Sequence, residues 1–272
     1  MNTKILERLV NTSSLNNVNN LSAELNLQNR GFYNEETIEI CTVGERNPKI
    51  FNIFTAAAIV TSAIGINVIK QETKHGNKNF INALGINLCS SYDEAKEQFE
   101  KDNICFIDSE SYDFIQPERL MLGTSSPQFA ENLINVLKKL ELKHVMVVNA
   151  QVPPLNVISI CSETTIYELK NNEILKYMIK PEDFGIKKAS ISSLTGATPE
   201  YNAGLIFDIF SGKIKDAKLD AVALNAGAMI YLSGKAKNLL DGILKAYSVI
   251  NSKNALNKIL ALQTSYKPVV SI

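Results

Sequence analysis

The 272-residue sequence lacks net charge, because 28 lysines and arginines balance 28 aspartates and glutamates. It therefore has no overall field to attract nucleic acid or an acidic membrane surface, although a local basic patch is compatible with this balance. It also lacks any Cys-x-x-Cys or Cys/His pair, since its four cysteines lie far apart, which argues against a zinc site or a disulfide framework. We expect a protein of the reducing cytoplasm that binds no membrane, and we do not expect a nucleic-acid partner.

Long uncharged runs are scarce as well. Residues 1–10 carry three charged side chains inside their only apolar stretch, so we expect no signal peptide. Residues 50–69 are uncharged and long enough to cross a bilayer, but polar side chains punctuate them. Gly65 separates a helical part from a β-branched part, so we interpret the stretch as a buried helix that leads into a buried strand.

What the sequence does contain, from residue 37 onward, is an alternation of strands and helices. Such alternation predicts a parallel sheet flanked by helices. Ser91 and Ser126-Pro127 have the residue types that begin helices. The predicted strands are 38–43, 66–69, 104–107, 120–124 and 144–148, and the predicted helices are 52–64, 92–101 and one that begins at Ser126-Pro127.

The second half of the chain changes character twice. Three short β-rich runs, 158–161, 165–169 and 174–179, predict antiparallel strands, and Asn171 and Asn172 suit a tight turn because asparagine tolerates positive φ. Four helices are then predicted, over 200–211, 219–233, 236–250 and 254–263. We interpret residues 1–35 as a small, reduced helical cap and residues 36–272 as the α/β domain.

Several motifs, in one consistent order, resemble the anthranilate phosphoribosyltransferase family, which belongs to glycosyltransferase family 3 and is similar to nucleoside phosphorylases. The resemblance covers roughly residues 37 to 262, with gaps. It implies an α/β domain with a smaller helical domain, usually in a homodimer, which transfers phosphoribose from phosphoribosyl diphosphate to anthranilate with magnesium in tryptophan biosynthesis. The motifs are Lys74-His75-Gly76-Asn77-Lys78, Pro181-Glu-Asp-Phe-Gly185, Leu224-Asn-Ala-Gly-Ala228 and Tyr231-Leu-Ser-Gly-Lys-Ala236.

The sequence departs from the family pattern where that pattern binds ligands. Gly44 is the one glycine where the family has Gly-Thr-Gly-Gly-Asp, a loop whose bare amides approach a diphosphate. Phe54 stands in place of a serine that donates to phosphate, and Asn156-Val157 in place of the Asp-Glu pair that holds magnesium. The Ser/Gly-rich loop expected after Lys78 and the acceptor-binding segment expected before Gln116-Pro117 are missing.

The candidate substrate-binding residues follow from the motifs that remain, and each has a structural alternative. The segment from Lys74 to Lys78 could contact phosphate or form a solvated Gly-Asn turn, and Lys70 could take the place of the motif lysine. Asn52 and Thr55 could hold phosphate or cap a helix. We predict no catalytic and no metal-binding residue. The candidates are Gly44, Arg46, Asn52, Thr55, Lys74, His75, Gly76, Asn77 and Lys78.

Two functions remain open at this point. The first is a divergent family member that has lost phosphoribosyl transfer, has no cofactor, and acts as a binding or partner subunit for a phosphorylated small molecule, a protein or a second copy of itself. The second is an active phosphoribosyltransferase with magnesium and with anthranilate or another acceptor. In it, Arg46, Lys49, Lys74 and Lys78 would replace the missing amide and metal charges. We expect Asn225 to bind backbone and His144 to be a strand-end residue.

Overall fold

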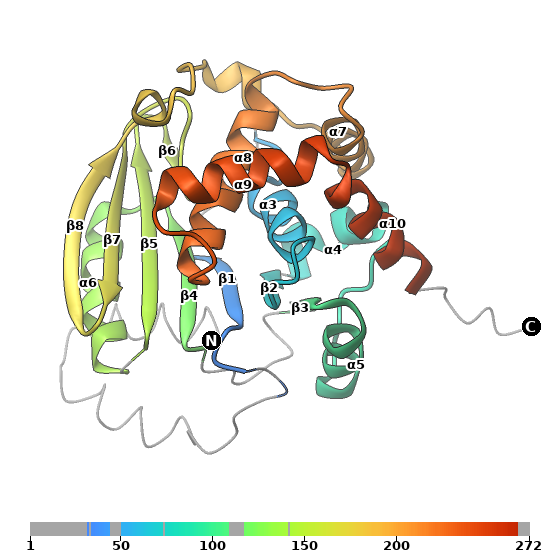
Figure 1. Cartoon of the computed structure of the whole chain (residues 1–272), viewed down its shortest axis with the longest axis horizontal. Helices are drawn as coiled ribbons and strands as arrows, with labels where there is room; N and C mark the ends of the chain where they lie inside the picture. Colours follow the sequence, from blue (N-terminus) through green and yellow to red (C-terminus); the bar gives the residue numbers. More distant parts are fainter. Residues whose placement is uncertain are drawn as a thin grey trace, which may run out of the picture.

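In the computed structural model, one mixed sheet runs through the molecule (Figure 1). The structure describes residues 32, 34–43, 50–72, 74–108, 117–140 and 142–265, with residues 74–78 as backbone only. The strand order is β3-β2-β1-β4-β5-β7-β8, with β6 paired to β5, and the pairs from β3 to β5 are parallel. The strands are β1 Ile38–Val43, β2 Val68–Glu72, β3 Ile104–Asp108, β4 Arg119–Thr124, β5 His144–Gln151, β6 Pro154–Leu155, β7 Thr164–Lys170 and β8 Glu173–Ile179.

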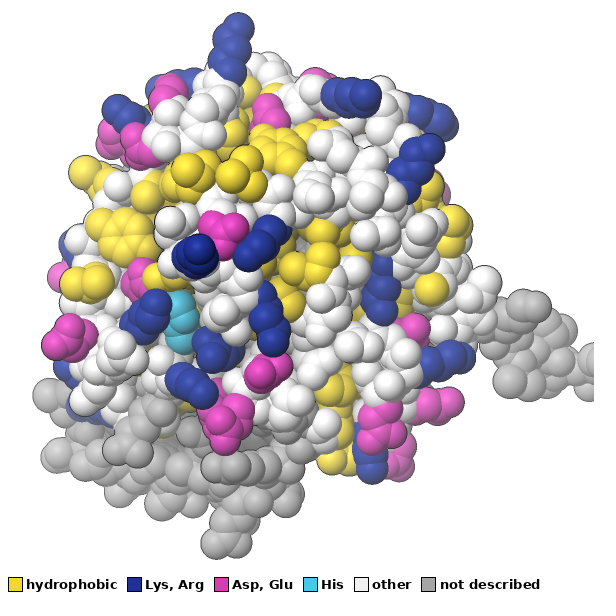
Figure 2. Space-filling model, in the orientation of Figure 1, with side chains coloured by type: hydrophobic (Ala, Val, Ile, Leu, Met, Phe, Trp, Pro, Cys, Tyr) yellow, Lys and Arg dark blue, Asp and Glu magenta, His cyan; other side chains and the backbone are white. Residues whose placement is uncertain are grey.

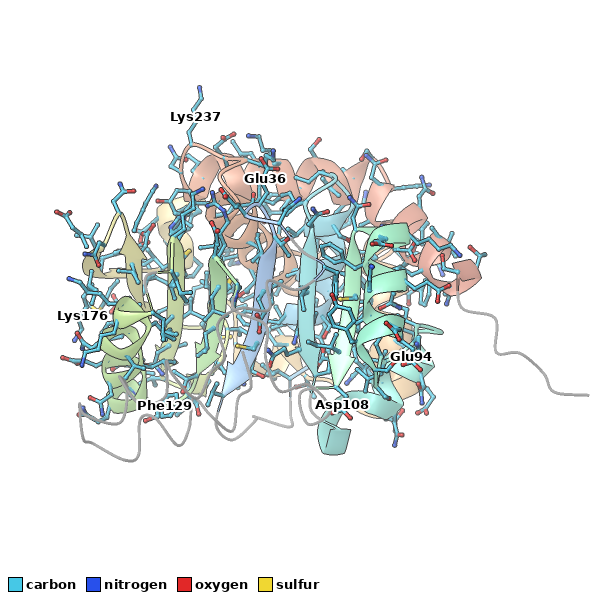
Figure 3. The ribbon with its side chains drawn as sticks, turned by 90° about the horizontal axis from the view of Figure 1, so that it is seen from below. Glu36, Glu94, Asp108, Phe129, Lys176 and Lys237 are labelled. Atoms are coloured by element: carbon cyan, nitrogen blue, oxygen red, sulfur yellow. The ribbon has the colours of Figure 1, made fainter. Side chains whose placement is uncertain are left out.

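Helices cover both faces of this sheet, which confirms the predicted α/β class (Figure 3). One face packs against α3 Ile53–Ser62, α4 Lys74–Ala83 and α8 Ala217–Leu232. Three more helices, α7 Pro199–Ser211, α9 Leu239–Asn251 and α10 Asn254–Ser265, pack against these helices. The other face packs against α5 Tyr92–Asp102 and α6 Pro127–Lys139. Two 3-10 turns, η1 Pro181–Phe184 and η2 Ile191–Leu194, connect β8 to α7.

Local sequence signals explain several boundaries of these elements. The Ser91 side chain accepts a hydrogen bond from the Glu94 amide, and so caps α5 as its residue type predicts. Ser126 caps α6 in the same way, with proline in the first turn. In the β7–β8 turn, Asn171 and Asn172 have φ of 52° and 62°, which confirms the predicted tight hairpin.

Small residues allow α8 and α9 to cross closely. A methyl group added at Gly242 would lie 2.1 Å from the carbonyl oxygen of Gly227, so the two backbones touch where these glycines meet. Asn225, which lies on α8, donates to the Ile158 and Ala221 carbonyls and accepts from the Ile158 amide, each at 2.9 Å. This confirms that its amide binds backbone.

Asn225 also explains a wrong prediction. Residues 158–161 are not a strand, because the side chain of Asn225 satisfies both backbone groups of Ile158 in place of a neighbouring strand. The second predicted strand ends later than expected, at Glu72 instead of Ile69, and so contains three polar residues. The Gly-Asn turn alternative for residues 74–78 is wrong too, since their backbone lies in the first turns of α4.

Two further expectations concern the chain ends and the uncharged stretch. The reduced helical cap at residues 1–35 lies almost wholly outside the described residues. Residues 50–69 contain the ten-residue helix α3 and the start of β2, which confirms the helix-then-strand interpretation. Among the described residues, none of the helices combines the length and apolar character needed to cross a membrane.

The face that carries α9 shows a group of lysine and arginine side chains below a band of hydrophobic side chains (Figure 2). Leu240 and Leu244, one turn apart on α9, are exposed. The lysines are mixed with carboxylates: Lys235 pairs with Glu36, and Lys245 pairs with Asp241. This face is therefore not a continuous basic stripe.

Candidate functional site at the carboxyl edge of the sheet

The candidate site lies where the parallel strands end. In open α/β sheets, ligands bind in the crevice beyond the carboxyl ends of the strands. The segment after β1 leads into α3, and α4 begins at Lys74, directly beyond β2. Because β1 and β2 are parallel neighbours, the two motifs predicted to bind phosphate leave the sheet side by side.

Of the nine candidate residues, the structure describes the side chains of two. Gly44 and Arg46 lie outside the described residues. Lys74, His75, Gly76, Asn77 and Lys78 are placed by their backbone in the first turns of α4. Asn52 and Thr55 lie together at the amino end of α3, as predicted.

Asn52 occupies the N-cap position of α3, but its side chain makes no capping hydrogen bond. Its Oδ1 instead accepts from Asn202 Nδ2 at 3.3 Å, and Asn202 Oδ1 accepts from the Ala197 amide at 2.8 Å. The pair connects the starts of α3 and α7. The capping alternative for the Asn52 side chain is therefore wrong, because the side chain ties two helices together.

Thr55 belongs to a buried ionic cluster. Its hydroxyl donates to Glu72 Oε1 at 2.7 Å, and Lys70 Nζ lies 3.3 Å from the same oxygen. The side chains of Lys70 and Glu72 are 2% and 0% exposed. Lys70 also donates to the Gln71 carbonyl. Lys70 therefore occupies the end of β2 itself, while Lys74 comes later, at the start of the next helix.

Among the residues whose side chains the structure describes, carboxylates outnumber ammonium groups around this cluster. Asp108 ends β3 in register with Glu72 and is buried (Figure 3). On the opposite face of the sheet, Gln71 Nε2 donates to Glu39 Oε1, and burial raises the pKa of Glu39 above its ordinary value. With Lys70, Glu72 and Asp108 ionised, the described ionisable groups at the ends of β2 and β3 sum to one negative charge.

Hydrophobic side chains fill the space between α3 and the end of β4. A methyl group added at Gly123 would lie 1.8 Å from the Asn156 carbonyl oxygen and 3.1 Å from the Phe54 ring. Phe54 and Val157 are 4% and 3% exposed and belong to one hydrophobic cluster. The residues that stand in place of a phosphate-binding serine and a magnesium carboxylate are therefore core residues.

A second polar cluster, which the sequence did not reveal, lies at the amino end of β5. His144 begins that strand, as predicted, and its Nε2 lies 2.7 Å from Glu168 Oε1. Tyr231 and Tyr177 donate to the same carboxylate at 2.9 and 2.7 Å. Burial alone would raise the pKa of Glu168, but the hydrogen bonds from His144 and both tyrosines outweigh it and lower the pKa below the ordinary value. Strand register brings His144, Glu168 and Tyr177 close together, whereas Tyr231 comes from α8, and sequence alone gives neither relation.

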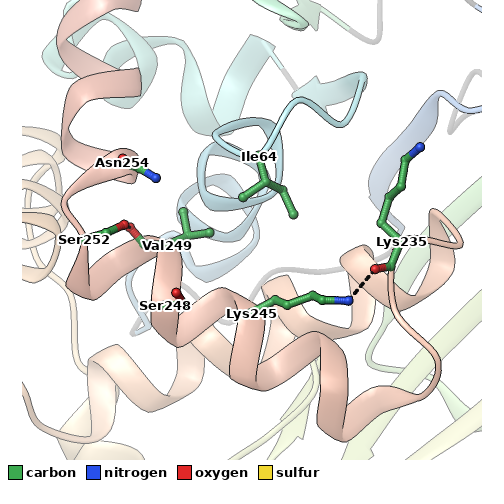
Figure 4. Close-up of a pocket in the computed structure, with 7 residues that line it drawn as sticks. All are labelled: Ile64, Lys235, Lys245, Ser248, Val249, Ser252 and Asn254. Atoms are coloured by element: carbon green, nitrogen blue, oxygen red, sulfur yellow. Dashed lines mark hydrogen bonds between the residues drawn. The ribbon is translucent and has the colours of Figure 1, made fainter.

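Neither the cysteines nor a pocket near α9 belongs to either of these two polar clusters. All four cysteines are buried and free, and burial raises the pKa of Cys41 and of Cys89 to about 12, so neither is a ready nucleophile. A pocket of about 360 Å³ lies beyond the carboxyl end of α3, against α9 and the start of α10 (Figure 4). Ile64 and Val249 line it beside Lys245, and neither Asn52 nor Thr55, the two predicted site residues whose side chains the structure describes, does.

Comparison with known proteins identifies relatives along most of the chain. The model of a glycosyl transferase family, a/b domain, matches residues 34–114 and 112–256. Anthranilate phosphoribosyltransferase from Geobacillus thermodenitrificans is 30% identical over 261 residues, which are 84% of this chain and 77% of the relative. The enzyme of that name from Methanobrevibacter smithii is 30% identical over 253 residues, 81% of this chain and 75% of the relative.

Solved structures agree at the level of the fold. Anthranilate phosphoribosyltransferase from Thermus thermophilus superposes with a TM-score of 0.75 at 23% identity, over 85% of this chain and 78% of that one. The Saccharomyces cerevisiae enzyme in complex with PRPP and Mg superposes with a TM-score of 0.74 at 21% identity, over 84% and 73% of the two chains.

Proposed function

Because the chain belongs to the anthranilate phosphoribosyltransferase family, within the glycosyl transferase family whose a/b-domain model it matches, we propose that it retains the family scaffold but has lost phosphoribosyl transfer. In this proposal it acts as a binding or partner subunit. The yeast relative binds phosphoribosyl diphosphate and magnesium. At the carboxyl edge of this sheet, the polar side chains of Thr55, Lys70 and Glu72 bond to one another.

The observation that carries this proposal is the ionic cluster of Thr55, Lys70 and Glu72. A phosphate must be held by amide, hydroxyl or cationic donors. The hydroxyl proton of Thr55 is donated to Glu72, and the ammonium group of Lys70 is paired with the same carboxylate. A polyanion at this edge would have to displace Glu72, which is fully buried, and would also meet the Asp108 carboxylate.

The residues in place of the magnesium ligands support the same conclusion. A hard divalent cation takes carboxylate and other oxygen ligands. Val157 offers none and is buried in the core, while Asn156 offers one neutral amide oxygen. These residues do not fit magnesium.

Loss of the groups that bind phosphate and magnesium would strongly reduce the rate of phosphoribosyl transfer. Single donors or metal ions that stabilise transition-state charge in enzymes are worth about 3 kcal/mol or more each. The glycine loop, the phosphate-binding serine and the acidic pair are all replaced in this sequence. Three such losses together would slow the transfer by about six orders of magnitude, since each 1.4 kcal/mol is a factor of ten.

Isothermal titration of the purified protein with phosphoribosyl diphosphate, with and without magnesium, tests this proposal. We expect no magnesium-dependent heat of binding, and no phosphoribosyl-anthranilate when anthranilate is added and the mixture is separated by chromatography. Micromolar, magnesium-dependent binding, or turnover that scales with protein concentration, would overturn the proposal.

One observation favours a second candidate, an active transferase that replaces amide and metal charges with side-chain cations. The segments that contain Arg46, Lys49, Lys74 and Lys78 follow the adjacent strands β1 and β2, so these cations could converge on one ligand. If this candidate is correct, the wild type will show turnover, and Arg46→Ala and Lys74→Ala will each reduce it. Cations that point to separate faces in an experimental structure would exclude it.

The remaining expectations are part of the same proposal. We propose that residues 1–35 form a reduced helical cap on an α/β domain of residues 36–272, and that the protein forms a homodimer in the cytoplasm. Light scattering coupled to gel filtration measures the mass in solution. A mass near twice the 30.0 kDa of one chain supports the dimer, and a single-chain mass at micromolar concentration refutes it.

A further inference from the structure

The pocket of about 360 Å³ beyond the carboxyl end of α3 is lined by groups that donate hydrogen bonds (Figure 4). Its polar lining consists of two lysines, two serines and one asparagine, and among the described residues no carboxylate lines it. Ile64, just beyond α3, faces Val249 and Lys245 of α9 across this space. Donors beside an apolar surface suit a ligand that combines a hydrogen-bond acceptor with an apolar body.

Lys245 is the donor best placed to hold such an acceptor. Its Nζ donates to the Lys235 carbonyl at 2.7 Å and to Asp241 Oδ2 at 3.0 Å, which fixes the direction of the side chain. An ammonium group has three N–H donors, so one remains without an acceptor among the described residues. The side chain lines the pocket and is 43% exposed, so a ligand can reach it.

The charges around the pocket favour an anion. Lys235 pairs with Glu36 at 3.3 Å, and both side chains are more than half exposed. Hydrogen bonds from the Lys237 amide and the Lys245 ammonium lower the pKa of Asp241, and the charges of both lysines act in the same direction. Three ammonium groups and two carboxylates therefore leave one positive charge, and neither carboxylate lines the pocket. Exposed ion pairs contribute little to stability, so an incoming carboxylate can share the lysine donors.

Further observations favour an organic acid over a bare anion. Ser248 lies one turn after Lys245 on α9, and its hydroxyl has no hydrogen-bond partner among the described residues. Ile64 is 37% exposed although it is apolar, and Val249 is buried. A carboxylate bound at Lys245 and Ser248 would place an aliphatic chain against these two residues. The volume is more than twice that of a cavity of about 150 Å³ that accepts benzene, so roughly ten non-hydrogen atoms fit. We propose that this pocket binds a small carboxylic acid with an aliphatic body, with Lys245 as its anchor.

Titration calorimetry with hexanoate tests the proposal on the full-length protein. The informative variant is Lys245→Met, which keeps the length of the side chain and removes its charge and donors. Lys96→Met is the matched control, because Lys96 is also about half exposed and pairs with a carboxylate one turn away, but lies on α5 and does not line the pocket. We expect saturable binding to the wild type and the control within about twofold of each other. The Lys245→Met variant should bind at least about tenfold more weakly, as expected for loss of a charge-assisted hydrogen bond.

Hexylammonium, which has the same chain but the opposite charge, should not bind. Acetate and inorganic phosphate, which lack the apolar body, should bind at least about tenfold more weakly than hexanoate. If Lys245→Met does not fold, as judged by circular dichroism, Ile64→Asn replaces it and should weaken hexanoate binding at least about fivefold while Lys96→Met does not. Absence of hexanoate binding up to about 10 mM would overturn the proposal. Binding of hexylammonium or phosphate as tight as that of hexanoate, or unchanged binding to the informative variant, would do the same. These outcomes do not depend on whether the protein transfers phosphoribose.

Discussion

The buried Lys70–Glu72 pair supports a specific prediction about stability. Replacing Glu72 by glutamine keeps an oxygen near the Thr55 hydroxyl but leaves the Lys70 ammonium buried without its 3.3 Å carboxylate. Breaking a buried ion pair by removing one partner typically costs about 3–5 kcal/mol, because the remaining charge stays desolvated and loses that partner's attraction. Both side chains are at most 2% exposed, so solvent cannot screen this loss.

Removing both charges should cost much less. A neutral pair of similar volume leaves no buried charge, and such replacements are often neutral or stabilising. We therefore expect Glu72→Gln and Lys70→Met each to lower the free energy of unfolding by about 3 kcal/mol, and the double variant to lose far less than the sum. The coupling energy should be about 2–3 kcal/mol.

Urea unfolding followed by circular dichroism measures all four proteins of this cycle. The surface pair of Lys96 and Glu100, 3.9 Å apart and about half exposed, provides the control cycle. Its coupling should stay below about 0.5 kcal/mol. A cost below about 0.5 kcal/mol for Glu72→Gln, or additive single effects in the main cycle, would refute the view that Glu72 neutralises Lys70.

Three further predictions concern packing, pH and the Asn225 contact. Gly123→Ala would place a methyl group 1.8 Å from a carbonyl oxygen and should destabilise the fold by about 3 kcal/mol or more in urea unfolding. No atom lies within 4 Å of the methyl group that Gly204→Ala would add, so that variant should stabilise the fold by about 0.5–1 kcal/mol in the same assay. Although burial opposes them, hydrogen bonds lower the pKa of Glu168 below its ordinary value of 4.5. The stability that these bonds contribute is therefore complete above pH 4.5 and is lost as the pH falls through the pKa of the folded state. Glu168→Gln should therefore flatten the decline of unfolding free energy at acid pH, and an unchanged acid profile would contradict this. Asn225→Leu removes three hydrogen bonds and should cost about 3 kcal/mol by the same assay, and a loss below about 1 kcal/mol would show that water replaces the amide.

Most of the fold could be predicted from the sequence because its signals are local. Caps such as Ser91 and Ser126 act within one helical turn, and the Asn171-Asn172 turn fixes its own hairpin. The missed features depend on distant partners. The strand predicted at 158–161 failed because its backbone is satisfied by Asn225, 67 residues from Ile158.

The candidate site could be predicted less well, for a related reason. The β-rich signal ended at Ile69, since a lysine, a glutamine and a glutamate rarely occupy consecutive positions of a central strand. Thr55, Glu39 and these residues themselves supply hydrogen-bond and ionic partners in the described part of the chain. The motifs predicted a site at this edge of the sheet, whereas the pairing of Lys70 with Glu72 is a tertiary feature.

The changes at this edge are physically consistent with one another. A site that binds a diphosphate and a magnesium ion keeps unpaired donors and carboxylates, which cost stability while the ligand is absent. Here Phe54 and Val157 bury apolar surface where such groups would stand, and Glu72 supplies internally the negative charge that a ligand would bring to Lys70. Each replacement removes a polar group that would otherwise need solvent or ligand. In the proposed function, the substitutions that stabilise this edge also reduce its capacity to hold a polyanion, so restoring one ligand-binding residue alone would lower stability before it raised affinity.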